Sequence, residues 1–193
     1  MPRPKSFDPD TVLAEAMGVF WEKGYDAASI SDLTAAMGIN RFSLYDTFGD
    51  KHELYLKALD SYHERIVEPH LAKIDAIDSL DALEGYFSMI IEYQHSDEHS
   101  KCCMMHMAAT SLIGADAAAK EKISAVCNQA HHAFCGVFQR IKDKGELREG
   151  INIEAAAWIV KIAQTGLVSF SAAPIPEVQA KAAFKLLVGQ FRA

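Results

Sequence analysis

The sequence lacks any apolar run of about 18 or more residues, which is the length that a membrane-spanning helix needs. Its first residues, Met1-Pro-Arg-Pro-Lys-Ser6, also lack the apolar segment and the cleavage site of a secretory signal. No low-complexity segment or internal repeat is present. These absences predict a protein that stays in the cytoplasm and has no membrane partner.

Cysteine is scarce, and its spacing excludes a disulfide framework. The four cysteines are Cys102, Cys103, Cys127 and Cys135, and no two of them form a CxxC pair. In a reducing compartment such residues stay as thiols. Any chemistry that they perform is therefore expected to be conditional rather than structural.

Basic residues are also few, because the formal net charge of the 193-residue chain is -7. Between Met1 and Glu53, five basic residues stand against nine acidic residues, which leaves a net charge of -4. This balance excludes diffuse, charge-driven attraction to nucleic acid or to anionic membranes. A DNA-binding function would need a specific local surface, and its affinity would depend steeply on salt.

Period-two alternation is hard to find, whereas apolar residues make up 50% of the chain and recur at helical spacing. We therefore predict an all-α protein of about nine helices. Its expected domains are a three-helix DNA-binding domain with a helix-turn-helix at residues 6–66 (motif 29–48) and a larger helical effector-binding and dimerisation domain at residues 67–193. Expected helices run from Asp8 to Gly24, from Asp50 until Pro69 interrupts, from Leu80 to Gln94, from Lys101 to Ile113, from Ala117 to about Lys144, from Glu154 to about Phe170, and from Pro176 to about Gln190.

The strongest local pattern lies between the first two of these helices. Ser29 and Asp32 have capping-box spacing, which predicts the start of a short helix. Gly38 can take a positive φ, and Asn40 can cap a second short helix that runs to Phe48. Two short helices around a glycine turn are typical of a helix-turn-helix.

Three segments carry a resemblance to a known family: Ser29-Ile-Ser-Asp-Leu33, Met37-Gly-Ile-Asn40 and Ser43-Leu-Tyr-Asp-Thr-Phe-Gly-Asp-Lys51. They resemble the DNA-binding region of TetR-family transcriptional regulators over about the first third of the chain. The resemblance implies that Tyr45 and Lys51 hold DNA phosphates. The rest of the chain is similar to the family only in helical layout and length.

The second short helix is the expected reader of the major groove, with Leu44 and Phe48 as its buried anchors. Arg41 could reach guanine, and Phe42 could touch a thymine methyl group or pack against the preceding helix. Asp46 could accept a hydrogen bond from cytosine N4 or remain a solvated carboxylate. The predicted DNA-binding residues are Ser29, Ser31, Asn40, Arg41, Phe42, Ser43, Tyr45, Asp46, Thr47 and Lys51.

A second unusual stretch is Glu98-His-Ser-Lys-Cys-Cys-Met-Met-His-Met107. Zinc would want four ligands, and successive cysteines on a helix point about 100° apart, so neither a metal nor another cofactor is predicted. A thiol with His99, Lys101 or His106 as a neighbour could sense an oxidant or an electrophile, while core packing is the alternative. The candidate effector and sensor residues are Tyr86, Tyr93, Cys102, Cys103, His106, Met107, Phe134 and Trp158.

The last two helices, from Glu154 to Gln190, combine small residues with apolar ones, which suits a four-helix bundle between two copies as well as an intramolecular core. The sequence thus predicts a homodimeric, ligand-responsive transcriptional regulator, most simply a repressor of a palindromic double-stranded DNA operator, with an unknown small-molecule or electrophile inducer. No enzyme activity is predicted. The alternative is an all-helical thiol enzyme or a non-DNA-binding adaptor that uses Cys102 and Cys103.

Overall fold

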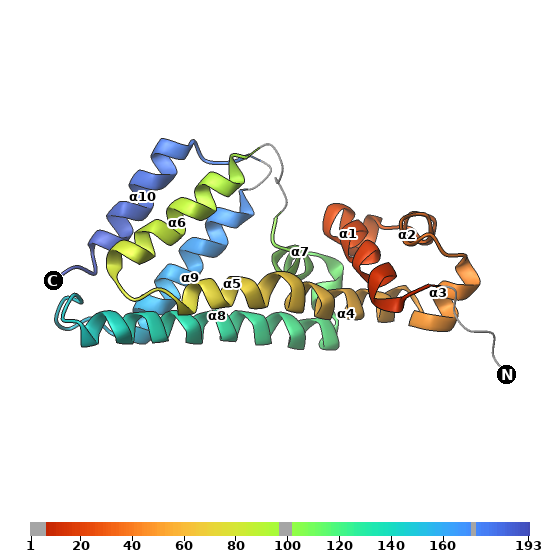
Figure 1. Ribbon diagram of the computed structural model, residues 1–193, viewed down its shortest axis with the longest axis horizontal. Helices are drawn as coiled ribbons and strands as arrows, with labels where there is room; N and C mark the ends of the chain where they lie inside the picture. Colours follow the sequence, from red (N-terminus) through yellow and green to blue (C-terminus); the bar gives the residue numbers. More distant parts are fainter. Residues whose placement is uncertain (1–6, 97–101, 171–172) are drawn as a thin grey trace. The chain divides into compact units, whose positions relative to one another are not determined.

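The computed structural model describes residues 7–96, 102–170 and 173–193 (Figure 1). Within these ranges the regular structure is helical, apart from one isolated bridge between Leu147 and Arg192. The all-α prediction is confirmed. The number of α-helices in the described ranges also agrees with the prediction, if the helical segments that follow one another without a break at 51–75 are counted as one helix. No helix in these ranges combines the length and the apolarity needed to cross a bilayer.

The chain divides into two compact units, and the first comprises residues 1–67 and 103–124 where they are described. Within it α1 packs against α2, α4 and α7, and α3 contacts α2 and α4. Its core is formed by apolar side chains of all these helices, such as Phe20, Leu33, Leu44 and Leu54. Its elements are α1 (Pro9–Ala27), α2 (Ile30–Met37), α3 (Arg41–Phe48), α4 (Lys51–Tyr62), the π-helix η1 (His63–Val67), α7 (Met104–Thr110), the 3-10 helix η2 (Leu112–Ala115) and the start of α8 (Ala117–Asp143).

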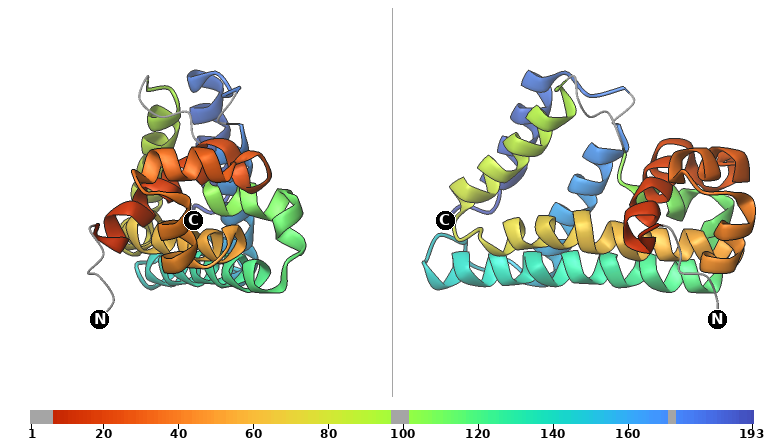
Figure 2. Two further views of the ribbon diagram at one scale, coloured as in Figure 1. Left: turned by 90° about the vertical axis from the view of Figure 1, so that its right-hand side faces the viewer. Right: turned by 45° about the vertical axis from the view of Figure 1, so that its right-hand side comes forward.

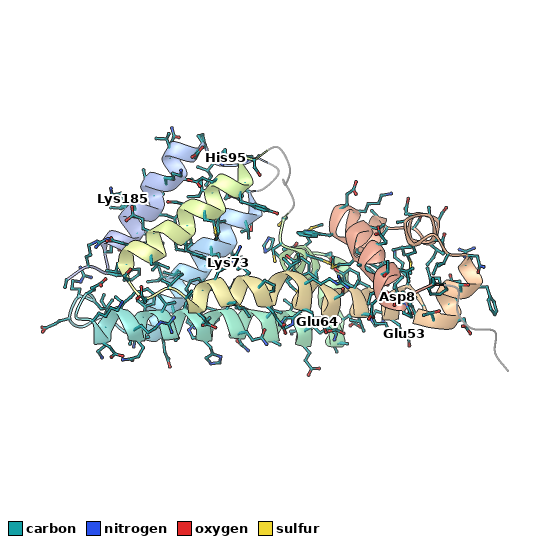
Figure 3. All side chains as sticks on the ribbon, viewed as in Figure 1. Asp8, Glu53, Glu64, Lys73, His95 and Lys185 are labelled. Atoms are coloured by element: carbon teal, nitrogen blue, oxygen red, sulfur yellow. The ribbon has the colours of Figure 1, made fainter. Side chains whose placement is uncertain are left out.

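Helix starts in this unit follow from side-chain caps. Asp8 accepts a hydrogen bond from the Thr11 backbone N–H at 3.1 Å, and Pro9 opens α1. Hydrogen bonds from the Thr11 hydroxyl and backbone hold the pKa of Asp8 below its ordinary value. Asp50 caps α4 by accepting from the Glu53 N–H at 2.8 Å. Asp8 and Glu53 are labelled in Figure 3, at the N-terminal ends of α1 and α4.

Pro69 does not end the helix that begins after Asp50, which corrects the predicted interruption. The π-helix η1 (His63–Val67) is followed directly by α5 (Glu68–Asp75). Pro69 therefore stands in the first turn of α5, where a missing N–H leaves no intrahelical hydrogen bond unmade. The wider turn before it absorbs the change in register.

The second unit comprises residues 68–102 and 125–193 where they are described. It contains α5, α6 (Leu80–Gln94), most of α8, α9 (Ile153–Ser169) and α10 (Glu177–Gly189), and α6 packs against both α9 and α10 (Figure 2). Phe87 on α6 stacks on Phe184 of α10 with ring centroids 4.2 Å apart. The long apolar stripes of α6 and α8 supply the core of this unit.

The observed helix bounds agree with the predicted ones to within one or two residues for α6, α8, α9 and α10. Two segments differ from their predictions. The helix α1, predicted to stop at Gly24, continues to Ala27 beyond a kink at Gly24, whose φ is 76°. After Lys101, α7 begins only at Met104 and ends at Thr110 before the 3-10 turn. Ser111 has an extended backbone, with φ of -102° and ψ of 173°, and its hydroxyl donates to the Ala108 carbonyl at 3.1 Å. Serine thus ends the helix by bonding to its last turn.

Candidate nucleic-acid interface

The helix-turn-helix is built by three local devices. Ser29 and Asp32 form a capping box: the Asp32 N–H donates to the Ser29 hydroxyl at 3.0 Å, and the Ser29 N–H donates to the Asp32 carboxylate at 2.9 Å. Gly38 ends α2 in the left-handed region, with φ of 64°. Asn40 then caps α3 by accepting from the Ser43 N–H at 2.8 Å.

The capping box is also tied to α1. Lys23 of α1 lies 2.6 Å from the Asp32 carboxylate. The hydrogen bond from Lys23, followed by those from Ser29, holds the pKa of Asp32 well below its ordinary value. Lys23 is therefore engaged within the domain, which leaves fewer basic side chains for a partner.

Helix α3 has one buried face and one exposed face. Leu44 and Phe48 are buried against the other helices of the unit, as expected of the anchors. Ser43 and Thr47 are half-buried, and Arg41, Phe42, Tyr45 and Asp46 are exposed. Six of the predicted DNA-binding residues thus share the two-turn helix Arg41–Phe48, and its outward surface contains side chains predicted to read bases and side chains predicted to hold phosphates.

The remaining predicted DNA-binding residues lie around this helix. Ser29, Ser31 and Asn40 are exposed at the start of α2 and in the turn, although Ser29 and Asn40 also serve as caps. Lys51 opens α4, and its ammonium lies 4.6 Å from the centroid of the Tyr25 ring. Cations are attracted to the face of an aromatic ring, so Tyr25 holds the Lys51 side chain in place.

Tyr25 is a residue that the sequence analysis missed. It lies at the end of α1 and contacts Tyr55 of α4 with ring centroids 5.0 Å apart. Burial raises the pKa of Tyr25 above its ordinary value and that of Tyr55 to about 12, so both rings stay neutral at physiological pH. No spacing rule pairs Tyr25 with Lys51, because their contact depends on how α1 packs against α4.

The sulfur-rich stretch borders α7, and the division between the two compact units falls within it, with Cys102 assigned to the second unit and Cys103 to the first. Cys103 is the N-cap residue of α7, Cys102 precedes it, and both thiols are half-buried. His106 and Met107 lie on α7, where the Met107 methyl group approaches Gly24 of α1. Since Cys102 lies before the helix, it is not on one helical face with His106. His99 and Lys101 lie outside the described residues, and among the residues that are described no group of three metal-ligating side chains occurs.

In the second unit, Tyr86 belongs to a buried polar cluster. Its hydroxyl lies 2.6 Å from His70 Nε2, and the Gln164 side chain donates to the Tyr86 oxygen and lies 3.1 Å from the same imidazole nitrogen. Burial raises the pKa of Tyr86 far above its ordinary value, so its hydroxyl donates and a neutral His70 accepts. His70 and Gln164 were missed because α5, α6 and α9 contribute one residue each.

The other candidate effector residues are not all brought together. Phe134 packs edge to face on Tyr86 with centroids 6.1 Å apart, so these two share one site. Trp158 stacks instead on His131 of α8 at 4.1 Å, and Tyr93 is half exposed at the end of α6. The structure thus separates the candidates into the Tyr86 cluster, the Trp158 stack, Tyr93 and the α7 segment.

Acidification is expected to weaken the second unit through His70. Burial first, and then Lys73 and Lys161, lower the pKa of His70 below its ordinary value. The unfolded chain, with a histidine pKa of about 6.5, therefore binds a proton more readily than the folded chain. The protonation of His70 therefore leaves the free energy of unfolding unchanged at a pH well above about 6.5. Below that pH the free energy of unfolding decreases, by at most about 1.4 kcal/mol per pH unit.

Thermal unfolding of the wild type and of His70→Gln between pH 8 and pH 5 would measure this effect. Glutamine keeps a hydrogen-bonding side chain but does not titrate. We expect the wild type to lose more stability than the variant over the lower half of the range. If the stabilities of the two proteins depended on pH in the same way, His70 would not be the cause of the loss of stability at low pH.

The chain resembles known regulators in sequence and in fold. Residues 12–58 match the family model described as bacterial regulatory proteins, tetR family. An uncharacterized HTH-type transcriptional regulator, YezE of Bacillus subtilis, is 35% identical over 159 residues, which cover 81% of this chain and 82% of that protein. The HTH-type transcriptional repressor ComR of Escherichia coli is 36% identical over 114 residues, which cover 57% of this chain and 53% of ComR.

Among solved structures, a cysteine mutant of the TetR family transcriptional regulator CifR in complex with 26-base-pair operator DNA has a TM-score of 0.83 and 28% identity. The similarity covers 97% of this chain and 98% of that one. These relatives are transcriptional regulators and not enzymes, which favours the regulator over the thiol enzyme or adaptor. Because the relationship to YezE spans most of both proteins, and the matched residues contain the helix-turn-helix, this chain belongs to the TetR family of DNA-binding transcriptional regulators.

Proposed function

We propose that this regulator is a cytoplasmic repressor that binds a palindromic operator as a homodimer and leaves it when a small molecule, an electrophile or an oxidant acts on the protein. Relatives described as repressors, such as ComR, support the repressor role. The CifR mutant bound to operator DNA supports a double-stranded DNA partner. The remaining parts of the proposal rest on the geometry of the two units.

The proposed DNA contacts come from the exposed surface of α3 and from its borders. Arg41, Phe42, Ser43, Asp46 and Thr47 would face the base edges. Tyr45 and Lys51 would hold phosphates, and Lys51 is already directed by Tyr25. Ser29, Ser31 and Asn40 would contact the backbone of the duplex beside them. With so few cations, the affinity would rest on two half-sites bound together.

The proposed dimer surface lies on α9 and α10. Trp158, Ile159 and Ile162 are exposed on one face of α9, and Val178 and Leu186 are exposed two turns apart on α10. Between the latter two lies Ala182, which with Gly189 keeps the surface of α10 shallow. Exposed apolar faces with small residues are suited to close helix packing between copies.

The observation that carries the sensing part is the position of α7. This helix, capped by Cys103, packs against α1 and α4 in the same compact unit that holds α3. The start of α8 joins it there, since Asp116 lies 3.1 Å from His52 and Lys122 lies 2.5 Å from Asp60. A displacement of the start of α7 would therefore alter the packing of α1 and α4, the helices that support α3.

The chemistry at this position is that of a half-buried thiol. A thiolate adds to the β-carbon of an α,β-unsaturated carbonyl compound, so that an S–C bond forms, the C=C π bond breaks, and the resulting enolate takes up a proton in place of the one lost from the thiol. With peroxide, the thiolate attacks the O–O bond, which leaves a sulfenic acid on sulfur and releases water. Either product enlarges a side chain at the start of α7, the helix that packs against α1 and α4. It would favour a conformation in which the two recognition helices no longer match their half-sites.

Replacing both cysteines with serine is expected to remove the response to oxidant. DNA binding would be measured on the gene's own upstream DNA across a salt series, with and without peroxide or a mild electrophile. We expect tight, salt-steep binding that weakens about 5- to 150-fold on treatment of the wild type. The Cys102→Ser/Cys103→Ser protein should bind equally well and keep its affinity after treatment.

Cys135→Ser is the matched control, because Cys135 lies on α8 and burial, followed by Glu154, raises the pKa of its thiol. This variant should respond as the wild type does. If the double-serine protein is still released by oxidant, Cys102 and Cys103 are not the sensor. If the wild type binds tightly and ignores oxidant, the inducer is noncovalent, and absence of specific binding would overturn the operator proposal itself.

A further inference from the structure

One side chain on the DNA-binding unit has no structural role in the fold. Phe42, the second residue of α3, is 78% exposed. At that exposure, packing against the preceding helix α2 accounts for little of the ring. Exposure of a large aromatic ring is unfavourable in water, and contact with an apolar group of a partner would remove that cost.

The helix geometry places Phe42 directly away from the core. The cap between Asn40 and the Ser43 N–H fixes the first turn of α3, and Leu44 and Phe48 anchor the opposite face. At about 100° per residue, Phe42 and Asp46 lie one turn apart on the outermost stripe of the helix. This stripe is the part of α3 that would reach furthest into a groove.

The charge on this stripe decides which part of the duplex it faces. Asp46 is exposed, and a carboxylate placed near phosphates would be repelled by them. The stripe would therefore face base edges, which leaves Tyr45 of α3 and Lys51 at the start of α4 for the backbone. The one apolar group that protrudes into the major groove is the C5-methyl group of thymine.

A protein partner fits this surface less well. Phe42 is flanked by Arg41 and Ser43 and followed by Tyr45 and Asp46, so it is a single apolar side chain within a polar surface. Protein interfaces instead gather several apolar residues into a contiguous core. Trp158, Ile159 and Ile162 are grouped in this way on one face of α9, whereas Phe42 stands alone.

We propose that Phe42 is a specificity-determining residue that contacts the methyl group of one thymine in each operator half-site. The proposal rests on the operator binding proposed above and adds the base that is read. Loss of a buried methyl group costs about four-fold in affinity, so loss of both thymine methyl groups from a palindrome costs about 15-fold.

Deoxyuridine tests the proposal, because it pairs as thymine does and lacks only the methyl group. The full-length protein would first select a binding site from random duplex DNA. Synthetic duplexes would then carry deoxyuridine in place of each thymine in turn, symmetrically in both half-sites. Affinity for each duplex would be measured with the wild type and with Phe42→Ala, whose fold would be checked by circular dichroism.

We expect the affinity of the wild type to fall about 15-fold when deoxyuridine replaces thymine at one position of both half-sites. The same replacement at the other positions should change its affinity little. Phe42→Ala should bind the thymine and deoxyuridine duplexes equally at that position. A wild type that is indifferent at every position, a selected half-site without thymine, or an unchanged ratio in Phe42→Ala would each overturn the assignment. Tight binding of the unmodified duplex in those cases would leave operator recognition intact, whereas failure to select any site would overturn both.

Discussion

Replacing Phe48 with alanine is expected to destabilise the helix-turn-helix strongly. Phe48 is 4% exposed and anchors the last turn of α3 against the other helices of its unit. Phenylalanine-to-alanine changes in a core typically cost about 3–5 kcal/mol, because they remove buried apolar area and leave a cavity. Since whole domains are stable by only about 5–15 kcal/mol, much of the unfolding free energy would be lost.

Phe42→Ala is the matched control, because it makes the same chemical change in the same helix at an exposed position. Urea unfolding followed by circular dichroism would report the two free energies of unfolding. We expect a large decrease for Phe48→Ala and a change within about 0.5 kcal/mol for Phe42→Ala. Similar values for the two variants would contradict the assignment of one buried and one exposed face.

The second large effect is expected at the proposed dimer surface. Ile162 is 65% exposed on α9 and Leu186 is 70% exposed on α10. Replacing both with glutamate would place unpaired charges in an apolar interface, and burial of such charges is strongly unfavourable. The protein should become monomeric and should lose about 100-fold or more in operator affinity, because two linked half-sites no longer bind together.

Sedimentation velocity and operator titration would measure these two consequences on the same samples. Met89→Glu is the control, because Met89 is an exposed apolar residue on α6, outside the proposed surface. It should leave mass and affinity unchanged. A double variant that remains dimeric would show that α9 and α10 do not hold the copies together.

Much of the fold could be predicted because its determinants are local. Residue types at fixed spacing predicted the Ser29–Asp32 capping box, the left-handed Gly38 and the Asn40 cap. The structure shows the expected hydrogen bonds at both caps and the expected dihedral angle at Gly38. The apolar stripes of α6, α8, α9 and α10 gave helix bounds close to those observed. The two buried anchors of α3 followed from the same periodicity.

The errors also have local causes. Pro69 was expected to end a helix, but the π-turn before it shifts the backbone register so that proline falls in a first turn. The helix expected from Lys101 begins only at Met104, which leaves Cys102 outside it. The choice between an α-turn, a π-turn and an extended residue involves small energy differences that packing decides.

The sequence by itself determined that the chain is helical, where α3 begins and ends, and which face of α3 is apolar. These features depend on hydrogen bonds and periodicities within a few residues. Only the tertiary structure decided that α7 packs with the DNA-binding helices, that Lys51 lies over Tyr25, and that His70, Tyr86 and Gln164 meet. Such contacts join residues far apart in the chain, and they arise from the packing of whole helices rather than from any local pattern.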